Sequence, residues 1–428
     1  MAYHQFLDRG HPDDYRREEI QALLQAIRAR ENRLVLGLPG IGVSNMLRFL
    51  VARPELAGRK ATFAYLDCDA LDDCLDRGVF FAEVARQLAE QGLGDQPEGD
   101  KRGYERLKRL VTRVGGDPSR RLVIVVDQAN RILAGADRRF YRNLKALTDL
   151  NKRVCYLFAA GPLLSDVIDP DNLLFAGRRL AIGRLNARDC ANAIIEEAQR
   201  LGVEFDPEAQ ERLASLSGGY PGLLRAVCPA VAAERLDLSD PKGGLVAHFL
   251  ARGDVKYRCQ KIWNALDPSK QAALQLLADG RPDSAGTTAL AWLQDFGVVD
   301  DHEGEYRFFS PIFQHFVTDQ ATSLEPITIV GASAIFRNEQ EIVVAGKVFK
   351  GNREVHVSPL ELRLIACLKR ERKIYRKDDI AAYVYYEDEG KGEGISDTRI
   401  ENLVRQVRQR LGDQYIKAHW GKGYELVA

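Results

Sequence analysis

The sequence lacks the marks of several protein classes. Its seven cysteines stand singly and form no C-x-x-C pair, so neither a disulfide framework nor a zinc site is indicated. No apolar run approaches the roughly 18 residues that a membrane-spanning helix needs. The first residues also lack the basic segment followed by an apolar one that marks a secretory signal. We therefore expect a cytoplasmic protein without a metal site or membrane contact.

The chain as a whole also carries no net charge. The 61 basic residues are balanced by 61 acidic ones, which argues against a polycation that coats nucleic acid or membrane with its whole surface, although local patches remain open. A chain of 428 residues with 45% hydrophobic and 29% charged residues falls in the globular range. At roughly 100–200 residues per domain, this length predicts two to four domains.

Alternating strand and helix patterns fill residues 1–185. Four aliphatic or β-branched runs predict strands, and the alternation is typical of a parallel sheet with helices on both sides. Helical patterns alone continue through 186–250. Residues 251–320 combine helices with a short hairpin, which predicts a small winged-helix domain, and a polar linker separates it from 327–428. The predicted strands are residues 34–36, 61–66, 122–126 and 154–159.

A glycine-rich turn follows the first of these strands and precedes a helix. In this position a phosphate-binding loop reads G-x-x-x-x-G-K-[ST], and its backbone N–H groups point at phosphate oxygens. Val43 stands where that pattern has lysine, and valine has no charge to place against a phosphate. The candidate nucleotide-binding residues of this loop are Gly37, Gly40, Gly42, Val43 and Ser44.

The acidic motif of a nucleotide site also departs from the usual pattern. Asp127 ends a buried run, where an ATPase orients magnesium, but the following residue is Gln128 rather than glutamate. An amide cannot take a proton from water, so general-base catalysis is not available there. We expect no catalytic residue and a non-hydrolysing module that at most holds ATP or ADP without turnover. A nucleotide site with unusual chemistry is the alternative.

These motifs resemble those of the STAND and ORC/Cdc6-like branch of the AAA+ ATPases over residues 10–320. The segment 140–149 is similar to the helix that this family places after its acidic motif, and Gly-Gly-Tyr-Pro-Gly at 218–222 resembles the turn of its helical lid. The resemblance implies a P-loop NTPase α/β domain, a helical lid and a winged helix. It also implies that Pro221 lies near the base of any nucleotide that binds.

The segment 396–411 has a different pattern. Its apolar residues recur at helical spacing, which predicts one buried stripe, and arginine and glutamine occupy the other faces. Arginine can bond guanine, and glutamine or asparagine can bond adenine, in the major groove of DNA. An ordinary solvated basic face is the alternative. The candidate DNA-binding residues on this helix are Arg399, Asn402, Arg405, Gln406, Arg408, Gln409 and Arg410.

The flanking motifs extend this pattern. "SPLELRLIACL", "RKDDIAAYVY", "TRIENLVRQVRQRL" and "GKGYEL" resemble, in order, an OmpR/PhoB-type winged-helix DNA-binding domain across 335–428. The resemblance places Arg399, Asn402, Arg405 and Gln406 at the major groove. It assigns the pair Arg408 and Arg410 to backbone contact or to packing against the core.

The same resemblance assigns roles to two loops. Lys422, at the tip of the wing, would reach the minor groove or a phosphate. The loop 385–395 lies where the family contacts RNA polymerase, although its acidic and glycine-rich sequence also fits a plain solvated loop.

The sequence thus predicts a DNA-binding transcription regulator that binds double-stranded DNA as a homo-oligomer. Its architecture would be an AAA+/STAND-like P-loop NTPase α/β domain (1–185), a helical lid (186–250), a winged helix (251–320) and an OmpR/PhoB-type winged helix (327–428). The alternatives are an AAA+ initiator- or transposition-like DNA remodeller and a STAND-type defence signalling protein.

Overall fold

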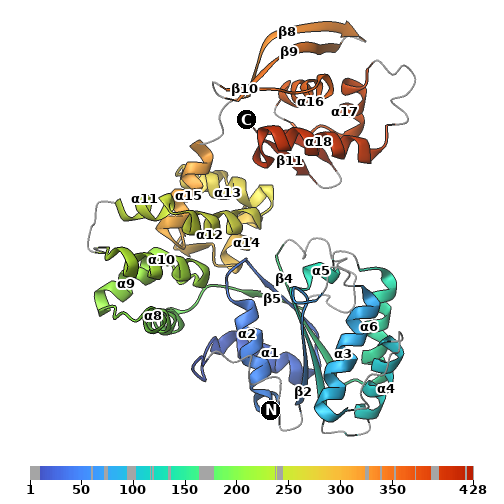
Figure 1. Ribbon diagram of the computed structural model, residues 1–428, viewed down its shortest axis with the longest axis vertical. Coiled ribbons are helices and arrows are strands. Elements are labelled where there is room, and N and C mark those ends of the chain that lie inside the picture. The colour runs from blue at the N-terminus through green and yellow to red at the C-terminus, as the bar shows by residue number, and fades with distance from the viewer. Residues whose placement is uncertain are drawn as a thin grey trace. The chain divides into compact units, whose positions relative to one another are not determined.

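The chain divides into two compact units, residues 1–318 and 319–428 (Figure 1). The division lies next to the predicted linker, and each unit is described by itself. The finer division of the first unit into three domains stays a prediction. The computed structural model describes residues 10–58, 61–71, 76–93, 103–115, 117, 120–133, 136–162, 178–236, 238, 244–322, 327–337, 340–350, 353–371, 373–386, 395–419 and 422–427.

Unit 1 is built on a five-stranded parallel sheet with the strand order β2-β3-β4-β1-β5. The four predicted strands are confirmed, and their residues are almost wholly buried. The fifth strand, at the edge, was not predicted because only one of its four residues is buried. The strands are β1 (Arg33–Gly37), β2 (Ala61–Asp67), β3 (Arg121–Asp127), β4 (Val154–Ala160) and β5 (Arg179–Ile182).

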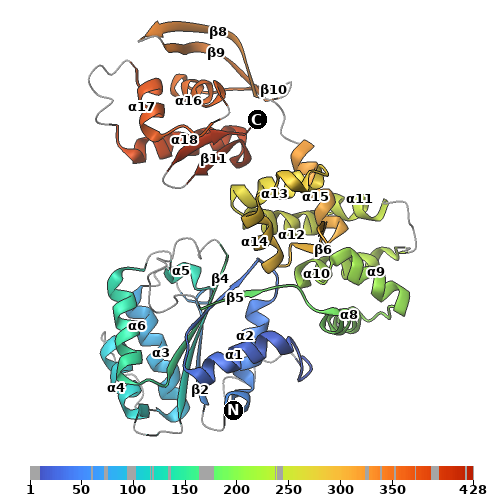
Figure 2. The same ribbon diagram turned by 180° about the vertical axis from the view of Figure 1, so that it is seen from behind.

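Helices cover both faces of this sheet, as the alternating pattern predicted (Figures 1 and 2). The helices α1 (Arg17–Ala29) and α2 (Val43–Ala52) lie on one face, and α3 (Arg77–Leu88), α4 (Gly103–Gly115) and α6 (Arg138–Leu150) lie on the other. The helix α4 was not predicted. The short segments η2 (Pro54–Ala57), η3 (Ala89–Leu93) and α5 (Asn130–Leu133) complete this part.

The rest of unit 1 is helical apart from one hairpin. Its two strands, β6 (Val299–His302) and β7 (Glu305–Phe308), meet at Glu303 and Gly304, which both have positive φ. The hairpin is the one predicted from sequence. The helices are α8 (Ala187–Leu201), α9 (Pro207–Ser217), α10 (Pro221–Glu234), α11 (Gly244–Ala251), α12 (Gly253–Asn264), α13 (Pro268–Ala278), α14 (Thr287–Asp295) and α15 (Pro311–Thr322), with the 3-10 turn η4 (Pro282–Ser284).

Unit 2 has a three-stranded antiparallel sheet, three helices and a C-terminal hairpin. Its middle strand is continuous, where the sequence predicted two shorter strands, and its third strand was not predicted. The elements are β8 (Ile327–Arg337), β9 (Gln340–Lys350), β10 (Arg353–Val355), α16 (Pro359–Lys369), α17 (Lys377–Val384), α18 (Asp397–Leu411), η6 (Asp413–Tyr415), β11 (Ile416–His419) and β12 (Gly423–Leu426).

Two observations bear on chemistry and location. Six cysteines are described, and all are buried free thiols whose pKa burial raises to about 11 or 12, so they stay protonated at neutral pH. Within the described part of the chain, no helix combines the length and apolarity that membrane crossing requires.

Arg16 joins the start of the chain to three other segments of unit 1. Its side chain is 1% exposed, and its guanidinium donates to the carbonyl oxygens of Ile41 (2.6 Å) and Gly183 (3.1 Å). Its backbone N–H donates to Asp189 on α8 (3.0 Å). An uncompensated buried charge is costly, so these partners make Arg16 a fixed crosslink between the glycine-rich loop, the segment after β5 and α8.

We predict that Arg16→Ala lowers the free energy of unfolding of unit 1 by about 3 kcal/mol, because buried partners lose their charged donor. Arg17→Ala, at an exposed neighbouring position, serves as the control and should stay within about 0.5 kcal/mol of the wild type. Urea unfolding of the full chain measures both. Equal effects of the two substitutions would contradict the crosslink.

Candidate functional site

The glycine-rich loop between β1 and α2 opens into a cavity of about 360 Å³. The helix α2 points its N-terminus at this space, and four other segments of unit 1 line it, at residues 127–130, 159–161, 221–225 and 258. All eight residues predicted for a nucleotide site therefore meet at one place. These are Gly37, Gly40, Gly42, Val43, Ser44, Asp127, Gln128 and Pro221.

The conformation of the loop is held by groups of the chain itself. Tyr220, which precedes α10, donates its hydroxyl hydrogen to the carbonyl of Pro39 (2.8 Å), and Arg16 donates to Ile41 as described above. Gly40 and Gly42 have φ values of 86° and 100°, which residues with a Cβ rarely adopt. The loop is therefore shaped as a phosphate cradle by protein contacts alone.

Val43 fills part of the space that the loop would leave for a lysine. Its side chain turns back over Gly37, since a Cβ on Gly37 would come within 2.4 Å of a Val43 methyl group. Val43 also packs against the hydrophobic core. The position that supplies a charge in a working loop therefore contributes only packing here.

Asp127, at the end of β3, is bound by neighbouring donors. It is 1% exposed, the hydroxyl of Tyr65 donates to its Oδ2 (2.6 Å), and the backbone N–H of Gln128 donates to its Oδ1 (2.9 Å). Burial raises the pKa of Asp127, against the opposing effect of these hydrogen bonds. A buried carboxyl that is engaged in this way is a poor ligand for a divalent cation.

Gln128 and Ser44 face each other across the cavity. The amide nitrogen of Gln128 lies 3.4 Å from the hydroxyl oxygen of Ser44, and its backbone has a positive φ of 54°. An amide donor in this position can orient a hydroxyl but cannot accept a proton from water. The residues present include donors that can bind an anion, and Gln128 offers no general base for hydrolysis.

Sequence reasoning missed two cations at this cavity. Arg225 on α10 and Arg258 on α12 both line it, and both are exposed. Arg225 stands four residues after Pro221, one helical turn along, so helical spacing could have located it. Nothing in the sequence signals Arg258, because it reaches the loop only through the packing of α12 against α10.

In unit 2 the helix α18 is amphipathic, as its spacing predicted. Its five buried residues, Ile400, Leu403, Val404, Val407 and Leu411, form the stripe expected from the sequence. Five of the predicted DNA contacts lie on its exposed faces, and their side chains make no hydrogen bond or ion pair with a described residue: Arg399, Asn402, Arg405, Gln406 and Gln409. The guanidinium of Arg399 lies over the ring of Tyr385 (4.5 Å).

The other two predicted contacts are tied to the protein. Arg408 is half-buried, and its guanidinium donates twice to the carbonyl oxygen of Ile416, at 3.0 and 2.7 Å. Arg410 forms an ion pair with Glu361 (3.0 Å), a buried residue that also completes the capping box of α16. Of the two roles that the resemblance offered, the structure places Arg408 in packing. Arg410 is paired but half exposed.

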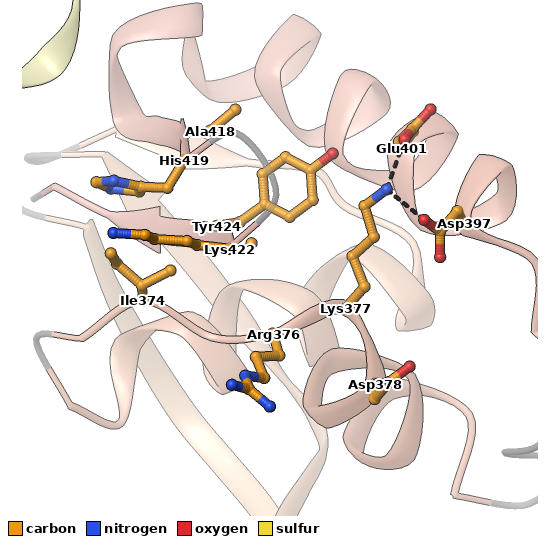
Figure 3. A pocket seen from close by; sticks show the side chains of 11 residues that line it. Ile374, Arg376, Lys377, Asp378, Asp397, Glu401, Ala418, His419, Lys422 and Tyr424 are labelled. Carbon is orange, nitrogen blue, oxygen red and sulfur yellow. Dashed lines mark hydrogen bonds and ion pairs between the residues drawn. The ribbon is translucent and has the colours of Figure 1, made fainter.

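A cavity of about 890 Å³ separates α18 from the C-terminal hairpin (Figure 3). Lys377, at the start of α17, extends across it and bonds Asp397 and Glu401 on α18, both at 2.7 Å. Arg376 and Lys422 also line the cavity. This arrangement was not predicted from the sequence. In it, the carboxylates of Asp397 and Glu401, beside the exposed face of α18, neutralise Lys377.

The hairpin is joined to the core at Gly423. Its φ is 132°, and a Cβ would come within 1.9 Å of the carbonyl oxygen of Tyr375, so only glycine fits. Lys422 is exposed beside it. The predicted polymerase-contact loop, 385–395, lies mostly outside the described residues, as do residues 420 and 421 of the wing tip.

The chain was compared with known proteins. No protein-family model matches it, and no curated protein does. Similar solved structures include a Walker-type ATPase of Pyrococcus abyssi, with 15% identity, 73% of this chain and 99% of that chain covered, and a TM-score of 0.47. The ORC2 protein of Aeropyrum pernix in its ADP form has 17% identity, 74% and 98% coverage, and a TM-score of 0.43.

A third similar structure is the Aeropyrum pernix ORC1 protein in complex with DNA, with 14% identity, 81% and 91% coverage, and a TM-score of 0.37. At these values none of the three assigns the chain to a family.

We predict that Val43→Lys tightens ADP binding about tenfold or more, because it adds a charge-assisted hydrogen bond at the phosphate cradle. Val43→Met adds length without charge and is the matched control. Titration calorimetry with ADP measures both variants, and equal affinities would contradict the assignment of the cavity. Hydrolysis of ATP should stay at background in the lysine variant, because Gln128 still offers no base.

We predict that two substitutions on α18 differ in how much they change the free energy of unfolding of unit 2. Arg408→Ala removes both donors from the carbonyl of Ile416 and should lower the unfolding free energy of unit 2 by about 1–3 kcal/mol. Arg405→Ala removes an exposed side chain and should change it by less than about 0.5 kcal/mol. Urea unfolding distinguishes the two, and equal values would contradict the anchoring role of Arg408.

Proposed function

We propose that this protein is a DNA-binding transcription regulator whose unit 2 binds double-stranded DNA through α18. The observation that carries the proposal is the exposed face of this helix. Asn402, Arg405 and Gln406 stand on it, opposite the buried stripe, without side-chain partners among the described residues. Arg399 is exposed on the same helix, with its guanidinium over the ring of Tyr385 (4.5 Å). Arginine and amide side chains at such positions match the donors and acceptors of base edges in the major groove.

The elements beside α18 support the same function. Lys422 is exposed on the C-terminal hairpin, which would act as the wing, and Arg376 faces the cavity between hairpin and helix. A recognition helix needs flanking cations because phosphate contacts set its register on the duplex, while base contacts provide the specificity. These features support the proposal that unit 2 is an OmpR/PhoB-type winged helix.

For unit 1 we propose a non-hydrolysing AAA+/STAND-like module that acts as a scaffold or sensor. The parallel sheet, the shaped loop and the helical lid support the fold. Val43, the hydrogen-bonded Asp127 and Gln128 support the loss of hydrolysis. Nucleotide binding without turnover, assembly as a homo-oligomer and contact with RNA polymerase stay predictions of this proposal.

A second candidate is a nucleotide-dependent DNA remodeller. The observation in its favour is the cavity itself, which remains open and gains Arg225 and Arg258 as cations that a nucleotide's phosphates could contact. Sedimentation of the full chain on DNA with and without ATP separates the two candidates. Assembly that depends on nucleotide favours the remodeller, and nucleotide-independent binding favours the regulator.

The regulator proposal is tested by selecting genomic DNA fragments with the full chain at physiological salt and sequencing those retained. One enriched motif is expected. Arg405→Ala should weaken binding to that motif by about 5- to 150-fold, the equivalent of one bidentate base contact at 1–3 kcal/mol.

Lys347→Ala, at an exposed site on β9, is the control for this test and should leave affinity within about twofold, as expected of a surface position outside the interface. Recovery without a motif, or an Arg405→Ala variant that binds like the control, would contradict the proposal. It would instead favour a signalling protein whose winged helices bind other proteins.

A further inference from the structure

Two helices of unit 1 carry a concentration of positive charge that the nucleotide cavity does not use. In a chain whose total charge is zero, α4 and α6 together contain eight basic and two acidic residues. Six of these cations are exposed, and we call them the α4–α6 basic face: Arg109, Arg113, Arg138, Arg139, Arg142 and Lys145.

The arginines of this face lack the acidic partners that other arginines of the same part have. Around the sheet, Arg33 pairs with Glu31 (2.7 Å), Arg48 with Asp67 (3.0 Å) and Arg77 with Asp137 (3.0 Å). In contrast, none of the five guanidinium groups of the basic face forms an ion pair or hydrogen bond with a described residue. Among the described residues of unit 1, no carboxylate therefore pairs with them to offset their mutual repulsion.

The cations form rows on the outer side of the molecule. Arg138, Arg142 and Lys145 recur at helical spacing along one side of α6, over about 10 Å at 1.5 Å per residue. Arg109 and Arg113 stand one turn apart on α4. Both helices cover the same face of the sheet and pack against each other, and the buried residues of each, such as Leu107 and Leu144, point inward.

We propose that the α4–α6 basic face binds the phosphate backbone of double-stranded DNA without reading its sequence. This would be a second DNA contact of the chain, in addition to that of α18. Rows of exposed arginines suit a polyanion, because each guanidinium offers a fork of donors to one phosphate. A membrane surface would also need several apolar side chains among the cations, and Leu150, at the end of α6, is the one large apolar residue that the described parts of α4 and α6 expose. The inference shares its ligand with the proposed function but rests on different residues.

This second contact changes what the chain can do on DNA. A short duplex held by α18 alone leaves the basic face unused, whereas a long duplex can occupy both surfaces of one chain or of neighbouring chains. Linked contacts add their effects through a high effective concentration. Affinity should therefore rise with duplex length, even for DNA without a preferred sequence.

The test uses the full chain and a triple charge reversal, Arg138→Glu, Arg142→Glu and Lys145→Glu. The matched control, Arg17→Glu, Lys256→Glu and Lys261→Glu, makes the same change in net charge at exposed helical positions elsewhere in unit 1. Affinity for a long duplex of arbitrary sequence is measured over a range of salt concentrations, and thermal unfolding checks that both variants are folded.

The reversal should reduce the slope of log affinity against log salt by about 2–3, since each lost phosphate contact contributes about 0.9. Affinity at low salt should fall at least tenfold, and the control should lose less than about threefold. A reversal variant that behaves like the control would overturn the proposal. So would a change in the oligomeric state of the DNA-free protein, which would make the face a contact between copies.

The outcome is separable from that of the proposed function. If unit 2 reads no sequence, no motif is enriched, yet the slope difference between reversal and control persists. If unit 2 reads DNA and the basic face does not bind it, Arg405→Ala weakens binding to the motif. The triple reversal variant then shows the same salt dependence of affinity as its control, and this result overturns the present inference alone.

Discussion

The buried guanidinium of Arg16 is the contact on which the geometry of unit 1's candidate site depends. A single side chain holds the glycine-rich loop at Ile41 and the segment after β5 at Gly183, while its own backbone is bound by Asp189 of α8. One charged group therefore links the glycine-rich loop, the end of the sheet and α8. Because this group is removed from water, its partners cannot be lost without cost.

This crosslink explains how the loop can keep its shape without a bound ligand. In a working nucleotide site the loop is stabilised partly by the phosphates that it binds. Here Arg16 and Tyr220 bond two loop carbonyls directly, so the loop needs no ligand to remain ordered. Nothing in the fold then requires a lysine at Val43 or a glutamate at Gln128, and unit 1 can serve as a scaffold.

The elements that could be predicted from the sequence are those in which local pattern and burial coincide. The four central strands are apolar throughout because both faces of the sheet are covered, and α18 shows its buried stripe in helical spacing. The edge strand β5 and the helix α4 were missed. The first is too short and exposed to show a pattern. The helix α4 did carry a signal that was overlooked, since Leu107, Leu110, Val111 and Val114 recur at helical spacing and are buried.

The same contrast between local pattern and long-range packing separates the site residues that were predicted from those that were missed. The loop and Asp127 were predicted to belong to one site because they match the two motifs of a nucleotide site, and the family resemblance placed Pro221 beside them. All of them line one cavity. Arg258 and Lys377 were missed because their positions follow from packing between elements far apart in the chain. Arg408 was offered two roles, and its bonds to the carbonyl of Ile416 show the one that sequence alone could not select.

A neutral total charge conceals how the charges are arranged. Around the sheet several arginines are paired with carboxylates, such as Arg33, Arg48 and Arg77, and on α18 two carboxylates hold Lys377 beside the exposed face. Exposed arginines without a carboxylate partner among the described residues recur along α18 and along α4 with α6. Positive charge that the neutral total hides is therefore concentrated in rows on these helices. Such rows favour contact with an extended duplex over the nonspecific coating that a uniformly basic protein would show.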